Sequence, residues 1–359
     1  MKYKSQLEFT HKQQDKIGVL ITNLGTPQAP TKQALRPYLK QFLSDPRVVE
    51  IPKAIWWFIL NGIILNIRPK RSAEAYATVW TEQGSPLLTH TKDQCEGIRS
   101  RLTSQLGDNV IIDFAMRYGE PSITSAIDRL LNKGARKLFV LPLYPQYCAS
   151  TTGSTFDAVA EDFVNRRWLP ELRFLNQYCD LDGYINCLVD KIRAHWERHG
   201  RTDKLVLSYH GIPKRYLVNG DPYHCQCHKT SRLVAQKLGL TEHDYMTTFQ
   251  SRFGREEWLK PYTDETLKSL PKQGIKSVQV ICPGFSSDCL ETIEEIGEEN
   301  REYFIESGGD RFEYIEALNS DDQHLDMLTS IIINNIKDWT LDNDIELRHA
   351  LAIAMGADK

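Results

Sequence analysis

The sequence has almost no net charge and no apolar run at its start, and each absence excludes a class of function. Its 359 residues carry 44 Lys and Arg against 47 Asp and Glu, a formal net charge of −3, with both signs well mixed. This balance gives no electrostatic basis for nucleic-acid binding. The N-terminus, Met-Lys-Tyr-Lys-Ser-Gln-Leu-Glu, lacks the apolar core of a secretory signal peptide. We therefore expect a cytoplasmic protein that has no nucleic acid among its partners.

Cysteine is present, but the arrangements that define the common cysteine motifs are not. None of the eight cysteines belongs to a Cys-x-x-Cys pair, so neither a standard zinc hand nor a thioredoxin-like motif is present. In the cytoplasm these cysteines are expected to remain reduced thiols. The first expected strand leads into residues 23–27, Asn-Leu-Gly-Thr-Pro, which contain neither a Gly-x-Gly-x-x-Gly turn nor a phosphate-binding P-loop. A dinucleotide-dependent oxidoreductase is therefore disfavoured.

Short β-branched or aromatic runs alternate with helical patterns along most of the chain. The expected strands are residues 17–23, 110–116, 137–144, 172–178, 204–209, 245–250, 277–282 and 312–317. Strands that alternate with helices predict parallel sheets covered on both faces. The two halves also resemble each other, because residues 132–142 and 272–283 each place a helix-ending glycine before a strand that closes with proline.

This pattern predicts an α/β protein with two similar Rossmann-like domains, each a four-stranded parallel sheet flanked by helices, facing one another across a cleft. The expected divisions are an N-terminal domain of residues 1–180, a second domain of residues 181–320, and a C-terminal helix and tail, residues 321–359, that packs back on the first domain.

One apolar segment is unusual for a soluble protein. Residues 54–67, called the lip segment below, contain the pair Trp56-Trp57 and are followed by Arg68, Lys70 and Arg71. Its fourteen residues are too few to cross a bilayer, which takes about 20. Two interpretations remain open: a helix of the hydrophobic core, or a helix at a membrane surface or at the mouth of an apolar pocket. The adjacent tryptophans and the basic flank fit the second.

Glu291, Glu295 and Glu299, called the acidic row below, recur every four residues just after the expected strand 277–282. On a helix they would share one face, where like charges destabilise by roughly 0.2–0.5 kcal/mol per pair. Glu294 and Glu298 would lie about 100° around that helix. Taken alone, the pattern favours a solvated face with an acid in the first turn. The alternative is a row of ligands for cations or protons at the carboxyl end of a strand.

His210 changes this balance because it ends the fifth expected strand, on a turn that contains Gly211 and Pro213. A single histidine is more often structural than catalytic. Here its strand belongs to the same expected sheet as the strand before the acidic row, so the imidazole and the carboxylates should face one cleft. Such a set suits a first-row divalent ion such as Fe²⁺, and it also suits proton abstraction near neutral pH.

Several longer motifs resemble those of ferrochelatases. In the second half they are Ser-Tyr-His-Gly-Ile-Pro (208–213), Gly-Asp-Pro-Tyr (220–223), Phe-Gln-Ser-Arg-Phe-Gly with the following Trp-Leu-x-Pro-Tyr-Thr-Asp-Glu (249–265), and Gly-Phe-Ser-Ser-Asp-Cys-Leu-Glu-Thr (284–292). In the first half they are residues 18–27, 83–87 and 143–154. The resemblance covers residues 16–335 in the expected order. It implies a two-domain chelatase fold, and a lyase that inserts Fe²⁺ into protoporphyrin IX to give protohaem and two protons, the terminal step of haem biosynthesis.

The resemblance also implies roles for individual residues. By position, His210 is a metal ligand or pyrrole-proton acceptor, Glu291 is the glutamate opposite it, and Glu295 with Glu299 forms a relay for protons or metal. A local π-bulge would help to align these carboxylates. The implied porphyrin-binding residues are Leu24, Arg68, Tyr76, Ser85, Arg117, Tyr144 and Trp258. Of these, Arg68 or Arg117 could pair with the propionates.

Some features depart from the family pattern. Relatives often carry histidine where this chain has Cys289. Some bind a [2Fe–2S] cluster, but here no cysteine follows Cys289 and Ala149 occupies the position of the internal ligand. We therefore expect no such cluster and no permanently bound cofactor, with Fe²⁺ as a substrate. The segment His224-Cys-Gln-Cys-His228 has a tight Cys-x-Cys spacing without four evident ligands, so a helix start near a loop is favoured over metal binding.

Alternatives remain at this point. Another tetrapyrrole chelatase of the same fold could insert cobalt or nickel, and a non-catalytic carrier of metal or haem could use the same cleft. Protoporphyrin or coproporphyrin as natural substrate, monomer or dimer, and the route of iron entry are all left open. The lip segment predicts a peripheral contact with the inner face of the membrane.

Overall fold

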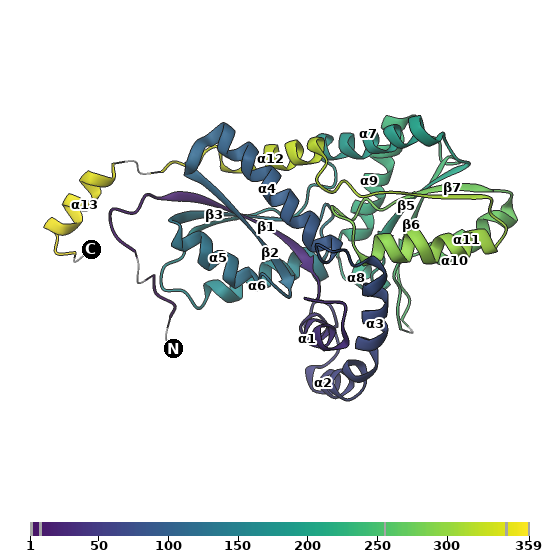
Figure 1. Ribbon diagram of the computed structural model, residues 1–359, viewed down its shortest axis with the longest axis horizontal. Coiled ribbons are helices and arrows are strands. Elements are labelled where there is room, and N and C mark those ends of the chain that lie inside the picture. Colours follow the sequence, from purple (N-terminus) through teal and green to yellow (C-terminus); the bar gives the residue numbers. More distant parts are fainter. Residues whose placement is uncertain (1–2, 7–8, 255, 342–343, 358–359) are drawn as a thin grey trace.

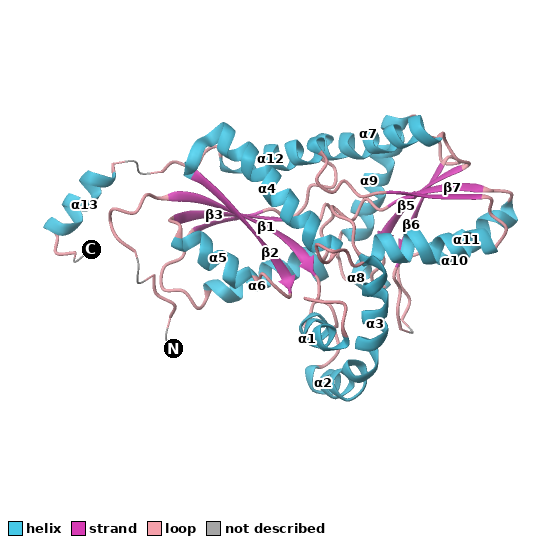
Figure 2. Cartoon of the chain, viewed as in Figure 1, coloured by secondary structure: helices cyan, strands magenta, loops and turns pink. Residues whose placement is uncertain are grey.

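The computed structural model describes residues 3–6, 9–254, 256–341 and 344–357. Within them the chain forms two four-stranded parallel sheets, ordered β2-β1-β3-β4 and β6-β5-β7-β8 (Figures 1 and 2). The strands are β1 (Lys16–Gly25), β2 (Val110–Tyr118), β3 (Ala135–Pro142), β4 (Glu171–Phe174), β5 (Lys204–His210), β6 (Tyr245–Gln250), β7 (Ser277–Ile281) and β8 (Arg311–Ile315). All eight expected strands are present, so the predicted α/β fold with two parallel sheets is confirmed.

Helices cover both faces of each sheet. They are α1 (Lys32–Leu43), α2 (Lys53–Ile59), α3 (Leu65–Val79), α4 (Pro86–Leu106), α5 (Ile123–Asn132), α6 (Ser154–Phe163), α7 (Asp182–His199), α8 (Lys214–Val218), α9 (Tyr223–Leu238), α10 (Thr263–Ser269), α11 (Arg301–Glu306), α12 (Asp322–Ile336) and α13 (Ile345–Ala354). Three π-helices interrupt them: Leu60–Ile64, Ala149–Gly153 and Glu291–Asn300, the last labelled η5.

The central strands supply the core. In β1 the run Val19-Leu20-Ile21 is fully buried, and in β5 Val206 and Leu207 are equally inaccessible. Parallel strands covered on both faces require such continuous apolar runs rather than alternation. Burial of this kind holds each strand in register, so the residues at the carboxyl ends of the strands are held in place too.

Helix α12 follows the second sheet in the chain and lies against α4, which flanks the first sheet (Figure 1). Gly97 of α4 makes this approach possible, because a Cβ there would lie 2.5 Å from Cδ1 of Leu325. At the edge of the contact Arg101 pairs with Asp322 and Asp326. Beyond α12 the chain leads to α13, whose Arg348 donates to Asp15 at 2.9 Å.

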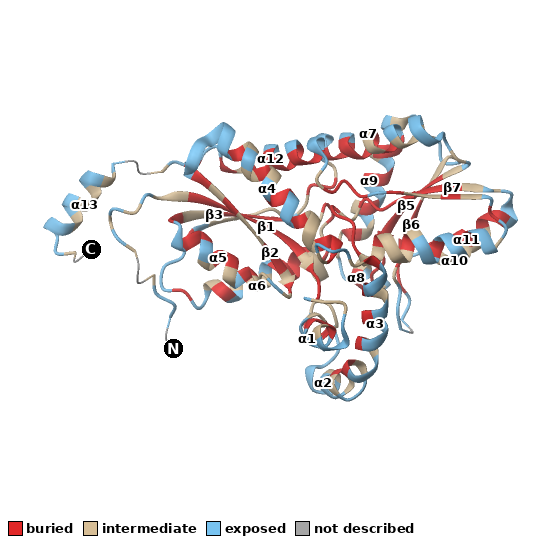
Figure 3. Ribbon diagram, viewed as in Figure 1, coloured by how far each residue is buried: buried red, intermediate tan, exposed pale blue. Residues whose placement is uncertain are grey.

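Helices α1, α2 and α3 form a separate projection below the space between the two sheets (Figure 1). The lip segment runs through α2 and the π-helix Leu60–Ile64 into the start of α3, and Figure 3 shows α2 largely exposed. Trp57, Phe58 and Ile67 are 59, 69 and 70% exposed, whereas Leu60 and Leu65 are buried. The core-helix interpretation is therefore wrong for most of the segment. In the described part of the chain, none of the helices has both the length and the apolarity needed to cross a membrane.

Candidate active site

A cavity open to solvent lies between the two sheets, with about 840 Å³ of empty space when the open mouth is included. Its walls come from the carboxyl ends of strands in both halves: Leu24 follows the buried part of β1, Tyr144 follows β3, His210 ends β5 and Phe285 follows β7. This is the edge at which open α/β sheets place their ligands. The lining is largely apolar, so the cavity suits an apolar molecule with a few polar groups at defined points.

His210 enters this cavity with one ring nitrogen already engaged. Nδ1 lies 2.6 Å from the carbonyl oxygen of Gly211, an acceptor only, so Nδ1 carries the proton and donates it. Nε2 is then the nitrogen with a free lone pair. A backbone contact of this kind sets the tautomer of a metal-binding or proton-accepting histidine.

The turn that carries His210 is held by close backbone packing. A Cβ at Gly211 would lie 2.8 Å from the carbonyl oxygen of Gln250 and 3.1 Å from the ring of Trp258, so only glycine fits there without displacement. The amide of Gly211 also donates to that same carbonyl at 2.7 Å. This packing fixes the direction of the imidazole.

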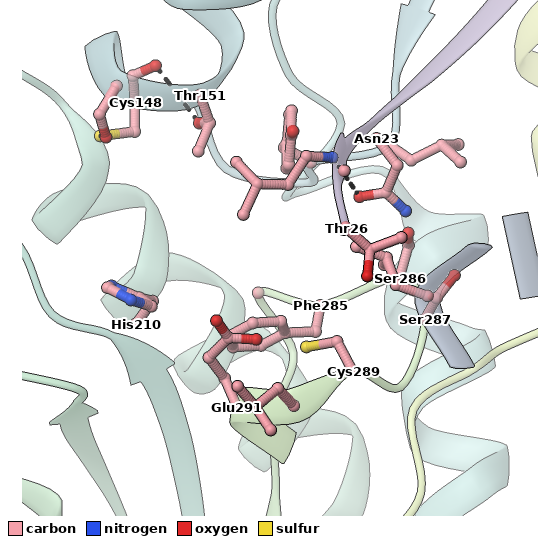
Figure 4. A pocket seen from close by; sticks show the side chains of 18 of the residues that line it. Asn23, Thr26, Cys148, Thr151, His210, Phe285, Ser286, Ser287, Cys289 and Glu291 are labelled. Atoms are coloured by element: carbon pink, nitrogen blue, oxygen red, sulfur yellow. Dashed lines mark hydrogen bonds between the residues drawn. The ribbon is translucent and has the colours of Figure 1, made fainter. Parts of the chain in front are cut away.

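Glu291 approaches the same space from the second sheet. It begins η5, the π-helix Glu291–Asn300, and lines the cavity. Figure 4 shows its carboxylate and the imidazole of His210 pointing into one space from neighbouring walls. The π-helix is longer than the local bulge we expected, since it spans ten residues. Its hydrogen bonds reach from residue i to i+5, which widens each turn.

Glu295 lies further along η5 and is clamped by Ser251. The amide and the hydroxyl of Ser251 both donate to its carboxylate, the amide at 2.7 Å. Burial raises the pKa of Glu295 to about 7, with hydrogen bonds from Ser251 acting in the opposite direction and repulsion from Glu291 adding to the rise. A carboxyl with this pKa can take up or release a proton at neutral pH.

The other acids of η5 do not form two separate faces. Burial raises the pKa of Glu294, and repulsion from Glu299, Glu298 and Glu291 adds to the rise. The expectation that Glu294 stands apart from the acidic row is therefore wrong, because it interacts with the carboxylates of Glu299 and Glu291. Glu298 and Glu299 are exposed, and Glu299 accepts a hydrogen bond from Tyr303 at 2.7 Å. The acids thus extend from the cavity to the surface.

Of the expected porphyrin-binding residues, four line the cavity: Leu24, Tyr76, Ser85 and Tyr144. The hydroxyl of Tyr144 is buried and has no hydrogen-bond partner among the described residues, and the same holds for Oε1 of Gln146 and Oγ of Ser286. All three residues belong to the cavity wall. Buried polar atoms without partners are costly, so we expect a bound water or a ligand group to complete their hydrogen bonds.

Comparisons with known proteins identify the family of this chain. The model of the family described as Ferrochelatase matches residues 16–336. A ferrochelatase of Idiomarina loihiensis is 63% identical over 352 residues, which cover 98% of this chain and 97% of the relative. One of Pseudoalteromonas atlantica is 63% identical over 360 residues, with complete coverage of both chains.

The chain belongs to the ferrochelatase family.

Among solved structures, that of SirB from Bacillus subtilis with Fe³⁺ superposes with a TM-score of 0.50 at 12% identity. The match covers 91% of this chain and all of SirB. At that identity the likeness shows the fold alone, and it confirms the expected two-domain chelatase architecture.

Three residues that the ferrochelatase resemblance placed at the porphyrin do not line the cavity. Trp258 is buried behind the Gly211 turn, so it supports His210 from outside. Arg117 directs its guanidinium to Asp45 and to the carbonyl and hydroxyl of Ser154, which engages its Nε and Nη2. Pairing of Arg117 with a propionate therefore stays a prediction that the structure does not support.

Arg68 stands between the lip segment and the second sheet. Its guanidinium lies over the ring of Phe253, 5.6 Å from the ring centre. Burial lowers its pKa, an effect opposed by the charges of Tyr38 and Glu291. Because Tyr38 and Glu291 both line the cavity, Arg68 lies close to the cavity without forming its wall.

Sequence reasoning missed three residues of this ferrochelatase site: Tyr38, Phe285 and Ser251. Tyr38 and Phe285 line the cavity, and Ser251 holds Glu295. Ser251 has a backbone φ of +65°, which is uncommon for a residue other than glycine. It lies within the motif Phe-Gln-Ser-Arg-Phe-Gly, but its role is not visible there, because its partner Glu295 lies 44 positions away.

Proposed function

We propose that this chain metallates protoporphyrin IX in the cavity between its sheets, with His210 and Glu291 as the reacting side chains. The enzyme is a lyase: Fe²⁺ enters the macrocycle, two pyrrole protons leave, and protohaem forms as the terminal step of haem biosynthesis. The observation that carries these roles is the entry of a free imidazole nitrogen and a carboxylate into one cavity. Fe²⁺ accepts both donor types, and both can also accept protons.

The acidic row gives the departing protons a route. Each metallation releases two protons. A single carboxylate at the cavity cannot hold both, so it must pass protons on. Glu295 follows Glu291 along η5 and has a pKa of about 7, raised mainly by burial. Glu299 follows at the exposed end. We infer that protons pass along this row to water, or that Fe²⁺ enters along it, since closely spaced carboxylates titrate as a coupled set.

The porphyrin is gripped by the apolar wall and oriented by the unpartnered polar atoms. Leu24, Tyr76 and Ser85 contribute from the first half of the chain, with Tyr144 after β3. Arg68 lies close enough to the cavity to form an ion pair with a propionate. We propose no resident cofactor, because the resemblance places Ala149 where cluster-binding relatives carry an internal cysteine ligand.

An anaerobic assay of the purified chain tests this function directly. Fe²⁺ is supplied with protoporphyrin IX or with coproporphyrin, and metallation is followed by the change in porphyrin absorbance. A ferrochelatase turns over many porphyrins per chain. A haem or metal carrier would show binding without turnover, and a chelatase for cobalt or nickel would prefer those ions to iron.

We further propose that the lip segment touches the membrane surface, which makes the enzyme peripheral on the inner face of the membrane. Trp57 and Ile63 are 59 and 55% exposed. Changing both to Ser should reduce binding to liposomes at least several-fold with little change in melting temperature, because neither side chain is part of the core. Flotation with anionic vesicles measures the first effect, and thermal unfolding the second.

Leu65 provides the matched control for this lip experiment. It lies in the same projection but is fully buried. Leu65→Ala should lower stability by about 2–5 kcal/mol, as expected for truncation of a core leucine. Unchanged vesicle binding in the Trp57→Ser, Ile63→Ser variant would contradict membrane contact through these two residues.

A further inference from the structure

Two histidines on α9 stand next to each other outside the cavity. His224 and His228 are one turn apart, with ring centres 4.5 Å apart and ring planes at 52°. Both lie beside the ring of Phe249, at 5.8 and 6.0 Å. Neither imidazole has a hydrogen-bond or ion-pair partner among the described residues. Side chains at positions i and i+4 share one helix face, so both rings can reach a common point.

The spacing of the two rings matches what a shared metal ion requires. An imidazole nitrogen binds a first-row divalent ion at about 2.0–2.1 Å. For two imidazoles bound to one ion at an angle of about 90–110°, that bond length puts the ring centres roughly 4.5–5.2 Å apart. The observed separation falls at the lower end of this range without rearrangement of the backbone.

Both rings are also held in the state that binds metal. Burial lowers the pKa of His224, and burial followed by repulsion from His224 lowers that of His228. Ligand histidines must be neutral, so this environment reduces the competition from protons relative to an ordinary histidine.

We propose that His224 and His228 form a two-histidine site for a divalent transition-metal ion of the class that prefers imidazole, such as Zn²⁺, Ni²⁺ or Cu²⁺. Within the described ranges no cluster of three or more His, Cys, Asp or Glu side chains could hold an ion, so water completes the coordination. The site goes beyond the chelatase activity. His224 follows Tyr223, which lines the cavity, yet neither His224 nor His228 belongs to the cavity wall.

The chain contains a second histidine pair that serves as a control. His195 and His199 on α7 have the same spacing in sequence, with ring centres 4.6 Å apart. There the Nε2 atom of His195 lies 2.8 Å from the carboxylate of Glu313, and Lys191 and Arg198 share the surface. One ligand nitrogen is already engaged, and the cations Lys191 and Arg198 stand among neighbours that also include Glu313 and Glu316. We expect this pair to bind metal much more weakly.

Calorimetric titration of the full chain with Ni²⁺ at pH 7.5 tests the proposal, in the wild type and in a His210→Ala background that weakens binding at the cavity. We expect the chain to bind one Ni²⁺ ion whose affinity depends on His224 and His228 of α9. His224→Ala and His228→Gln should each lower its affinity at least tenfold, and the double variant should lose little more, because chelation needs both rings. In the wild type, the same titration at pH 5 should show loss of this Ni²⁺ binding, because both imidazole rings become protonated.

A variant with His195→Ala and His199→Ala should keep this ion. The proposal is overturned if either single α9 variant retains wild-type affinity. It is also overturned if the double variant loses as much affinity as the two single variants together, as independent ligands would. A third contradiction would be that removal of the α7 pair weakens Ni²⁺ binding as much as removal of the α9 pair. Circular dichroism of each variant shows that α9 is intact. Failure here leaves the chelatase assay untouched, since neither His224 nor His228 lines the cavity.

Discussion

Replacing His210 with alanine should abolish metallation while the protein stays folded. Its Nε2 is the free imidazole nitrogen at the wall of the cavity, and a missing proton acceptor or metal ligand of this kind typically costs 10²–10⁴-fold in rate. The side chain ends a strand whose buried residues remain in place, so the melting temperature should change little. Initial rates with Fe²⁺ and protoporphyrin IX under anaerobic conditions measure the effect. Porphyrin fluorescence measures whether binding persists.

His195 supplies the matched control for that variant, as a histidine on α7 outside the cavity. His195→Gln should keep the wild-type rate. If His210→Ala retained a rate within a few-fold of wild type, the assignment of His210 as the reacting imidazole would be wrong. Glu291→Gln should lose rate to a similar degree, because it removes the carboxylate charge from the cavity that His210 also lines.

The second large effect is expected from the acidic row. A Glu295→Gln, Glu299→Gln double variant should lower kcat by about tenfold or more while porphyrin affinity is kept, because neither side chain lines the cavity. Glu294 is unsuitable as part of a control, since it interacts electrostatically with Glu299 and Glu291, and Glu298 in turn acts on Glu294. Glu302 and Glu306 of α11 are exposed and again four apart, and they suit this purpose.

The comparison therefore pairs Glu295→Gln, Glu299→Gln with Glu302→Gln, Glu306→Gln, two variants with the same change in charge. Steady-state kinetics with Fe²⁺ should show loss of rate only in the first. Equal kcat values in the two double variants would reject the relay and favour a solvated face.

Stability should also depend on pH through Glu295. Its pKa is about 7 in the folded chain, raised from the ordinary value of 4.5 mainly by burial. The folded state holds this proton more tightly than the unfolded state does. Its contribution is therefore complete below about pH 4.5 and is lost as pH rises through 7. Glu295→Gln should flatten this part of the stability profile. Urea midpoints at pH 5 and pH 8 measure it, and an identical pH dependence in both proteins would contradict the raised pKa.

Much of the fold could be predicted because it depends on local pattern. Strands buried on both faces favour uninterrupted apolar runs, and such runs are visible in β1 and β5, whereas β7 carries the buried Gln279 within its run. The pairing of His210 with Glu291 was also accessible. Both residues follow strands of one parallel sheet, and the carboxyl ends of such strands meet at one edge.

The individual contacts of several site residues were not accessible in this way. Arg117 ends β2 at the expected edge, yet its charge is taken by Asp45, 72 positions away in the chain. Trp258 belongs to a conspicuous motif, but it packs behind Gly211 instead of against the ligand. Ser251 reaches Glu295 only because its backbone takes a positive φ at the end of β6. Such pairings depend on how separate segments meet.

By itself, then, the sequence determined the alternation of strands and helices, the two parallel sheets, and the edge at which His210 and the acidic row converge. Hydrophobic periodicity is a local property of the sequence, so the pattern alone is enough to establish these elements. The tertiary structure alone decided that the lip segment is exposed, because nothing in an apolar run tells whether another layer covers it. It also decided that Glu295 is protonatable near pH 7. That property comes from the burial of its carboxyl and its nearness to other carboxylates, and the spacing of the acids in the sequence predicts neither.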